Sequence, residues 1–142
     1  MFDKEHGRIL KSGVIKVIGS TLREKIIYLE KEIIRIGTDT YGIVNTVYVE
    51  RLLPSMSKQT SFAFGALMGM IWSLDNEVQE VKPIEWRKLV YRNLREWDIK
   101  GIGREKQKAL AISEVKRRFN YKPIDDNEAE AILIAFAGSI LG

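Results

Sequence analysis

Acidic side chains occur at two places in the sequence where a carboxylate could take part in chemistry. At the first, Glu50 directly follows the apolar run of Val47, Tyr48 and Val49, at the end of an expected buried strand. In open α/β sheets, ligands bind beyond the carboxyl ends of the parallel strands. Glu50 is therefore expected at a ligand-binding edge. The alternative interpretation is that it ends the strand and points to water.

The second place is the stretch DDNEAEAILIA near the C-terminus. Glu130 follows Asp126 by four residues and Asn127 by three, so these side chains share one face of a helix. Two carboxylates at this spacing repel each other by a few tenths of a kcal/mol, and a divalent cation would turn the repulsion into coordination. Alternatively, Asp125, Asp126 and Glu128 complement the helix dipole. That alternative explains the first-turn acids better than it explains Glu130.

The composition limits the available ligands and nucleophiles. The chain has no Cys, which excludes disulfides and thiolate metal sites. His6 is its one histidine, which argues against a zinc cluster or a Ser-His-Asp site. Any bound metal must then be held by oxygen ligands, which favours Mg²⁺ or Mn²⁺.

Positive charge is concentrated in one segment of the chain. Residues 85–118 contain eleven Lys or Arg and five acids, although the whole chain has a net charge of only +4. A basic segment beside an acidic remainder indicates contact with a polyanion. A pair of solvated helices is the alternative interpretation.

The elements that must position these residues alternate along the chain. Strand character is expected at 8–19, 43–50 and 77–83, and the turn of a hairpin at 2–8. Helical spacing or composition indicates helices at 20–37, 57–74, 84–94, within 99–119 and at 126–141. This alternation predicts an α/β fold with a partly parallel sheet.

Length and hydropathy indicate the broad class of protein. With 142 residues, of which 45% are hydrophobic and 30% charged, the chain is expected to form one globular domain, 1–142. No apolar run reaches the roughly 20 residues of a membrane span, and the N-terminus does not resemble a signal peptide. We expect a cytoplasmic protein without membrane contact.

Five motifs, in their order and spacing, resemble the RuvC-type Holliday junction resolvases, and bacteriophage relatives look closer than the cellular enzyme. The motifs are VYVERLL (47–53), SFAFGALMGMIWSL (61–74), VKPIEWRK (81–88), GIGREKQKALA (101–111) and DDNEAEAILIA (125–135). The resemblance covers the whole chain. It implies an RNase H-like fold, with a mixed sheet and flanking helices, and a homodimer. The implied activity is cutting of four-way DNA junctions with two Mg²⁺ ions, with Mn²⁺ as a possible substitute.

The resemblance also assigns roles to the acids. Glu50 matches the family's strand-ending acid, which ligates metal, and Glu130 matches the acid of the last helix, which is usually Asp. Asn127 stands where the family often has a second helical Asp, with Asp126 beside it, so either could be the ligand. The implied mechanism is two-metal phosphodiester hydrolysis.

Basic and apolar residues near these acids match further parts of the family site. Lys106 matches a residue near the scissile phosphate and is the implied catalytic cation, and Arg87 or Lys88 matches another basic residue. Leu52 and Leu53 lie where relatives place a wedge at the junction centre, with burial in the core as the alternative. The candidate DNA-binding residues are Arg51, Arg87, Lys88, Arg104, Lys106 and Lys108.

One part of the family pattern has no counterpart. The family begins with a central strand that ends in an Asp, whereas residues 1–17 align with the hairpin that follows it. Asp3 lies in the hairpin turn and is a poor substitute for that ligand. We therefore expect an N-terminally incomplete version of a longer protein, or a degenerate relative. As given, the chain is expected to cleave four-way junctions weakly or not at all.

Three functions follow as hypotheses. The first is a magnesium-dependent endonuclease that resolves four-way junctions. The second is a catalytically impaired relative that binds branched DNA. The third is an RNase H-like nuclease that acts on other flaps or hybrids.

Overall fold

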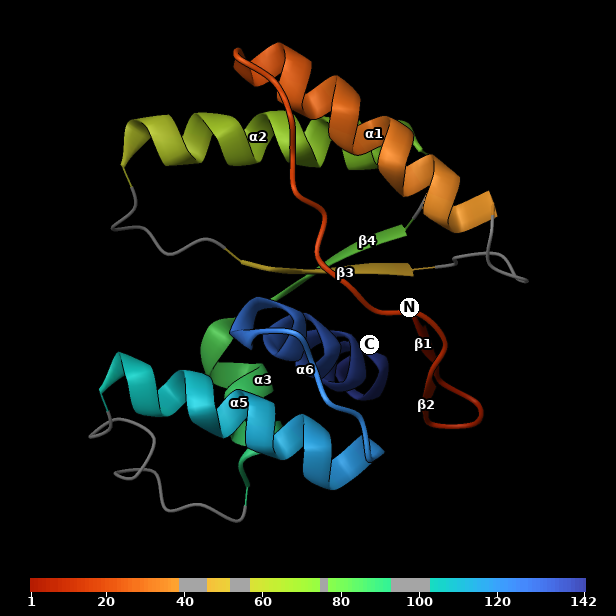
Figure 1. Cartoon of the computed structure of the whole chain (residues 1–142), viewed down its shortest axis with the longest axis vertical. Helices are drawn as coiled ribbons and strands as arrows, with labels where there is room; N and C mark the ends of the chain where they lie inside the picture. The colour runs from red at the N-terminus through yellow and green to blue at the C-terminus, as the bar shows by residue number, and fades with distance from the viewer. Residues whose placement is uncertain (39–45, 52–56, 75–76, 93–102) are drawn as a thin grey trace.

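The computed structural model describes residues 1–38, 46–51, 57–74, 77–92 and 103–142. Within them lie two two-stranded sheets and a set of helices (Figure 1). The strands are β1 (Phe2–Asp3), β2 (Arg8–Ile9), β3 (Thr46–Glu50) and β4 (Glu77–Val81). The helices are α1 (Leu22–Thr38), α2 (Lys58–Ser73), α3 (Pro83–Val90), α5 (Arg104–Phe119) and α6 (Asp126–Leu141). The predicted alternation of strands and helices is confirmed. No helix in these ranges is long and apolar enough to cross a bilayer.

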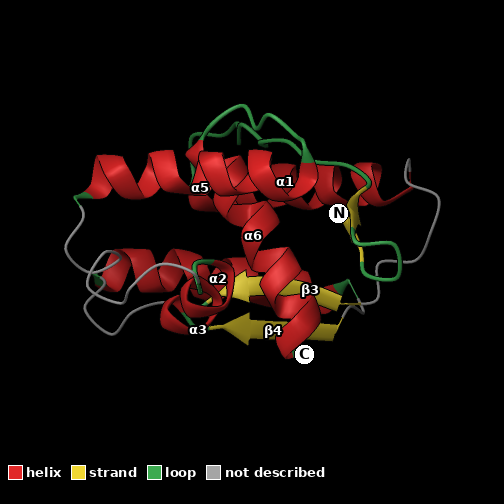
Figure 2. Ribbon diagram, turned by 90° about the horizontal axis from the view of Figure 1, so that it is seen from below, coloured by secondary structure: helices red, strands yellow, loops and turns green. Residues whose placement is uncertain are grey.

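The β3–β4 pair lies at the centre of the molecule and is parallel, as predicted. Thr46 is opposite Glu77 and Glu50 is opposite Val81, so both strands end at the same edge. Helices α1 and α2 lie on one side of this sheet, and α3, α5 and α6 lie on the other (Figure 1). Figure 2 shows the parallel course of the two strands from a second direction. The edge at which Glu50 ends is therefore flanked by helices from both sides.

The N-terminal segment departs from its predicted strand at 8–19. The expected hairpin turn is present, with β1 and β2 antiparallel and Gly7 at a φ of 61°. The Asp3 carboxylate accepts hydrogen bonds from the backbone N–H groups of Glu5 and His6 at 3.1 and 3.3 Å. Strand structure then ends at Ile9, and residues 11–19 are irregular. The strand prediction was wrong there because β propensity gives a strand only where a neighbouring strand accepts its hydrogen bonds.

The helices begin at residues that suit a helix N-terminus. These either accept hydrogen bonds from the free backbone N–H groups of the first turn or, like proline, have no N–H group. Thr21 and Glu24 form a capping box at α1, each side chain accepting a hydrogen bond from the other residue's backbone N–H. The side chains of Ser57 and Asp125 accept N–H hydrogen bonds at the starts of α2 and α6. Pro83 ends the β4 region and takes the first position of α3, where its missing N–H costs nothing.

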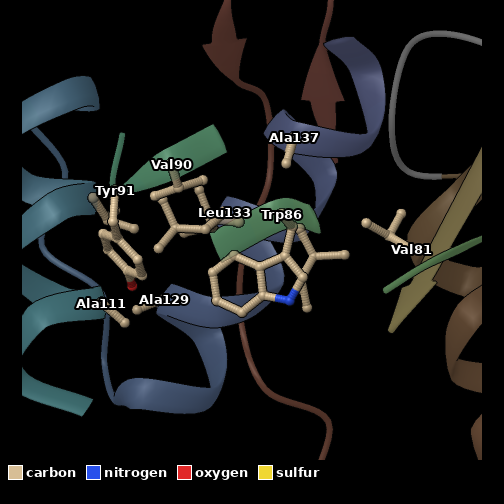
Figure 3. Packing of buried hydrophobic residues seen from close by; sticks show 11 residues of the cluster. Val81, Trp86, Val90, Tyr91, Ala111, Ala129, Leu133 and Ala137 are labelled. Carbon is tan, nitrogen blue, oxygen red and sulfur yellow. The ribbon is translucent and has the colours of Figure 1, made fainter. Parts of the chain in front are cut away.

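The hydrophobic core lies between α3, α5 and α6. Trp86 and Val90 of α3 pack with Leu133 of α6 (Figure 3). Val115 of α5 belongs to the same cluster, and each of these four residues is 2% exposed or less. Burying side chains of this size stabilises a fold by roughly 1.5–3 kcal/mol each. This packing fixes the two helices whose first turns carry the functional candidates of 104–108 and 126–130.

Helix α6 also lies unusually close to β3. A Cβ added at Gly138 would come within 2.3 Å of the Tyr48 ring, so only glycine fits at this position. The close approach holds α6 along the strand that ends in Glu50.

Candidate functional site

Glu50 is held in place by residues of α3. The indole N–H of Trp86 donates a hydrogen bond of 3.0 Å to Glu50 Oε1. The Arg87 guanidinium lies 3.8 Å from the same oxygen and stacks over the Trp86 ring, 5.2 Å from its centroid. Because Trp86 is 1% exposed, its indole is fixed by the core. Trp86 and Arg87 thus orient the Glu50 carboxylate from the α3 side, while one third of the Glu50 side chain stays exposed to solvent.

The first turn of α6 brings the second group of acids to the same edge. Asp125 is the N-cap, and Asp126 and Glu130 follow on one face of the helix. Lys108 of α5 lies 3.5 Å from an Asp126 carboxylate oxygen. Asn127 is exposed, one residue further around the helix.

The two groups of acids act on each other electrostatically. Burial raises the pKa of Glu130 above its ordinary value, and the negative charge of Glu50 raises this pKa further. Asp126 acts in the same direction, while Arg87 and Lys108 partly oppose the shift. Glu50 and Glu130 therefore lie on the same side of the molecule and within electrostatic range of each other. A carboxyl that is disfavoured as a free anion is a frequent feature of functional sites.

Two aromatic residues that the sequence did not indicate as site residues belong to this arrangement. One is Trp86, through its hydrogen bond to Glu50. The other is the buried Tyr91, whose pKa is raised first by burial and then by the charge of Glu130. The motif VKPIEWRK contains Trp86 but gives no indication that its indole turns toward Glu50.

The chemistry of the acids fits a divalent cation only in part. Glu50, Asp126 and Glu130 supply carboxylate oxygens, the donors that Mg²⁺ and Mn²⁺ prefer. In the described part of the chain, however, no three side chains of Asp, Glu, His or Cys are placed as a metal-binding group. Glu50 and Asp126 instead have Arg87 and Lys108 as their nearest positive charges. The donors are suitable, but the described residues do not arrange them as a metal-binding group.

The predicted DNA-binding residues fall into two groups. Arg87 and Lys108 face the acids, whereas Lys88, Arg104 and Lys106 are exposed. On an α-helix, residues that are two positions apart in the sequence point in directions that differ by roughly 200°. Lys106 and Lys108 therefore lie on nearly opposite faces of α5. Lys108 is thus the α5 lysine that the structure brings to the acids, and the role of Lys106 stays a prediction.

Arg51 and the wedge residues complete the set of predicted residues. Arg51 pairs with Glu80 of β4 at 3.4 Å and is more than half exposed. Leu52 and Leu53 lie outside the described residues.

Known structures provide a comparison for this fold. No protein-family model matches the sequence, and no curated protein sequence matches it either. The structure is similar to RuvC of Thermus thermophilus in complex with a Holliday junction substrate, with a TM-score of 0.66 and 12% identity. It is also similar to a second structure of Thermus thermophilus RuvC, with a TM-score of 0.61 and 14% identity. Both matches cover 92% of this chain and 75% of the other chain. The chain has a RuvC-like α/β fold.

Proposed function

We propose that the chain is a RuvC-like nuclease domain that acts on branched DNA. The observation that carries this proposal is that Glu50 lies at the carboxyl end of β3 and that its charge acts on Glu130 of α6. The carboxyl end of the strands is where α/β sheets bind their ligands. The similarity to a RuvC in complex with a Holliday junction supports the choice of substrate.

Glu50 and Glu130 would provide the first ligands for a divalent cation, with Asp126 as the third oxygen donor. Asp126 is favoured over Asn127, because the charge of Asp126 already acts on Glu130 whereas Asn127 is exposed. A bound Mg²⁺ or Mn²⁺, one ion or two, would polarise a phosphate and lower the pKa of its water. Trp86 keeps the Glu50 carboxylate oriented, and Tyr91, with its raised pKa, remains a neutral hydroxyl.

The cations around the acids would hold the DNA backbone. Arg87 and Lys108 lie beside the carboxylates and are placed to contact a phosphate close to the cleavage position. Exposed Lys88 and Arg104 would extend this contact along α3 and α5, whereas Lys106 lies on the face of α5 away from Lys108. Such contacts give affinity without sequence preference, and the affinity falls steeply with salt.

We also propose a homodimer formed through α2. Phe62, Gly65, Gly69 and Trp72 follow one another at spacings of three and four residues, so they share one helix face. Phe62 and Trp72 are exposed, and a Cβ added at either glycine would meet nothing within 4 Å. Sedimentation of wild type and of Gly69→Glu tests this face. The variant should be monomeric at concentrations where wild type is a dimer.

The test of the function uses a labelled four-way junction, its duplex arms as competitor, and Mg²⁺ or Mn²⁺. Wild type should bind the junction in preference to duplex and cleave it slowly. Glu50→Gln and Glu130→Gln should abolish cleavage but retain binding. Glu5→Gln, in the hairpin turn at the opposite end of the strands (Figure 1), is the matched control and should behave as wild type. Cleavage that persists in Glu50→Gln would contradict the proposal.

A second function is favoured by one observation. Arg87 and Lys108 already lie beside Glu50 and Asp126, and the described residues contain no group of three metal-binding side chains. A protein that binds branched DNA without cutting it would have this arrangement. It predicts junction binding that is equal with Mg²⁺ and with EDTA, and no cleavage with any divalent cation.

A further inference from the structure

Two of the acids at the candidate site have a positive side chain of the protein beside them. The Arg87 guanidinium lies 3.8 Å from Glu50 Oε1. The Lys108 ammonium lies 3.5 Å from Asp126 Oδ2. The cations come from α3 and α5 and the acids from β3 and α6, so the fold brings each pair together from separate elements. The protein therefore supplies its own counter-ions to carboxylates that a divalent cation would need.

Both ion pairs are loose. Their N–O distances exceed the roughly 2.7–3.2 Å of an N–H···O hydrogen bond. The four side chains are between 23% and 36% exposed, so water and other ions can reach them. Ion pairs that solvent reaches are typically weak, and a competing anion can separate them. The cations are thus held near the acids without being fixed there.

The acids keep their places without these cations. The buried Trp86 donates its indole N–H to Glu50 Oε1 at 3.0 Å. Asp126 lies in the first turn of α6, where the helix dipole favours a negative charge. Arg87 and Lys108 can therefore move to another anion while both carboxylates stay in place.

A metal ion bound by these acids would compete with the same two cations. The pKa of Glu130 is raised by burial first and then by the charge of Glu50. Arg87 and Lys108 lower this pKa, so their charge acts on the whole group of acids. Because like charges repel, the two side chains also disfavour a divalent cation among the carboxylates. Drawing them away from the acids would strengthen metal binding.

We propose that Arg87 and Lys108 are internal counter-ions that exchange partners when DNA binds. In the free protein they neutralise Glu50 and Asp126. In the complex the dense phosphate charge of DNA attracts both cations, which frees the carboxylates for a divalent metal ion. DNA and metal then raise each other's affinity by the same factor, because the two binding equilibria are linked. This inference rests on the proposed function and adds the order of binding to it, with DNA before metal.

Mn²⁺ binding to the full chain, measured by electron paramagnetic resonance with and without a four-way junction, tests the exchange. The junction alone is titrated in parallel, and the Mn²⁺ that it binds is subtracted. Wild type should bind Mn²⁺ about three- to tenfold more tightly with the junction, as expected from the loss of two exposed ion pairs. At constant ionic strength, anisotropy should show that Mn²⁺ tightens junction binding by the same factor.

Two variants assign the coupling to the cations. Arg87→Gln and Lys108→Gln each remove one charge and keep most of the side chain. Without DNA, each variant should bind Mn²⁺ about two- to threefold more tightly than wild type, and the junction should then add less. Lys25→Gln is the matched control, because it removes an exposed lysine of α1, on the other side of the sheet (Figure 1). It should match wild type in both measurements.

The outcomes separate this inference from the proposed function. Equal Mn²⁺ affinity with and without the junction would overturn the inference. So would Arg87→Gln and Lys108→Gln proteins that bind Mn²⁺ no more tightly than wild type. Neither result affects the nuclease proposal, which is tested by cleavage in wild type and in Glu50→Gln. A chain that binds Mn²⁺ neither alone nor with the junction would contradict the inference and the proposed metal ligands together.

Discussion

Glu128 and Glu130 stand two residues apart on α6 and have opposite electrostatic environments. Glu128 is 1% exposed and accepts hydrogen bonds from the Tyr121 hydroxyl at 2.8 Å and from the Ile124 backbone N–H. Burial would raise its pKa, but the hydrogen bonds from Ile124, Ser12 and Tyr121 lower it below the ordinary value. Glu130 has no hydrogen bond or ion pair within the described residues, and its pKa is raised.

The difference separates a structural carboxylate from a functional candidate. The Glu128 anion is stabilised by donors that tie α6 to the segment before it and to Ser12, so its charge stabilises the fold. Glu130 faces two other acids, and its charge opposes the fold unless a cation or a proton arrives. Burial raises the pKa of both residues, so the partners decide the sign of the net shift.

The largest expected effect is at the structural carboxylate. Glu128→Gln leaves one acceptor oxygen for several donors and turns an NH₂ group toward a donor, which costs about 2 kcal/mol. The melting temperature should fall by about 5–10 °C at pH 7. Because the folded pKa is lowered, the stabilising effect of Glu128 is present above its ordinary value of 4.5 and is lost as pH falls through the folded pKa. Calorimetry from pH 7 to pH 3 should therefore show the melting temperatures of wild type and Glu128→Gln converging.

The next effect concerns the residue that positions Glu50. Trp86→Phe keeps most of the buried ring but removes the N–H donor to Glu50, at a cost of about 1–2 kcal/mol. Thermal unfolding should show a fall of about 3–6 °C. Trp86→Phe should also weaken Mn²⁺ binding, because Glu50 is then less well oriented. Trp86→His, which can restore a ring N–H, should recover part of this loss in affinity. A Phe variant with unchanged Mn²⁺ affinity would show that the hydrogen bond is only structural.

Glu130→Gln should change stability in the opposite direction from Glu128→Gln. Removing the repelled charge is expected to raise the melting temperature by about 1–3 °C at pH 7. Since the pKa of Glu130 is raised, its destabilising effect grows as pH rises from the ordinary value of 4.5 through the folded pKa and is absent below. The gain should therefore disappear near pH 4. A loss of stability at pH 7 would remove the contrast between the two residues.

The smallest effect is on the titration of Glu130 itself. Arg87 and Lys108 lower its pKa, so Lys108→Ala should raise this pKa further, and the rise should be smaller at high salt. Carbon NMR of the Glu130 carboxyl against pH measures the change. Arg51→Ala is the control, because Arg51 pairs with Glu80 and is not among the groups that shift Glu130.

Local patterns were sufficient to predict much of this arrangement. Glu50 could be placed at the sheet edge from the apolar run before it, and Asp126 and Glu130 on one face from their spacing. The hydrogen bond from Trp86 to Glu50 and the position of Lys108 beside Asp126 could not be predicted. Both depend on how α3 and α5 are rotated about their axes against their neighbours. The strand predicted at 8–19 ends at Ile9, because pairing needs a partner that the sequence of the segment does not specify.

The central claim is that Glu50 and Glu130 bind one divalent cation together. Mn²⁺ binding, followed by electron paramagnetic resonance, tests it in wild type, Glu50→Gln, Glu130→Gln and the double variant, with Glu5→Gln as control. Each single change should weaken binding about tenfold or more, and the double change should add little, because either loss already breaks the shared site. Wild-type affinity in Glu130→Gln, or fully additive losses in the double variant, would contradict the claim.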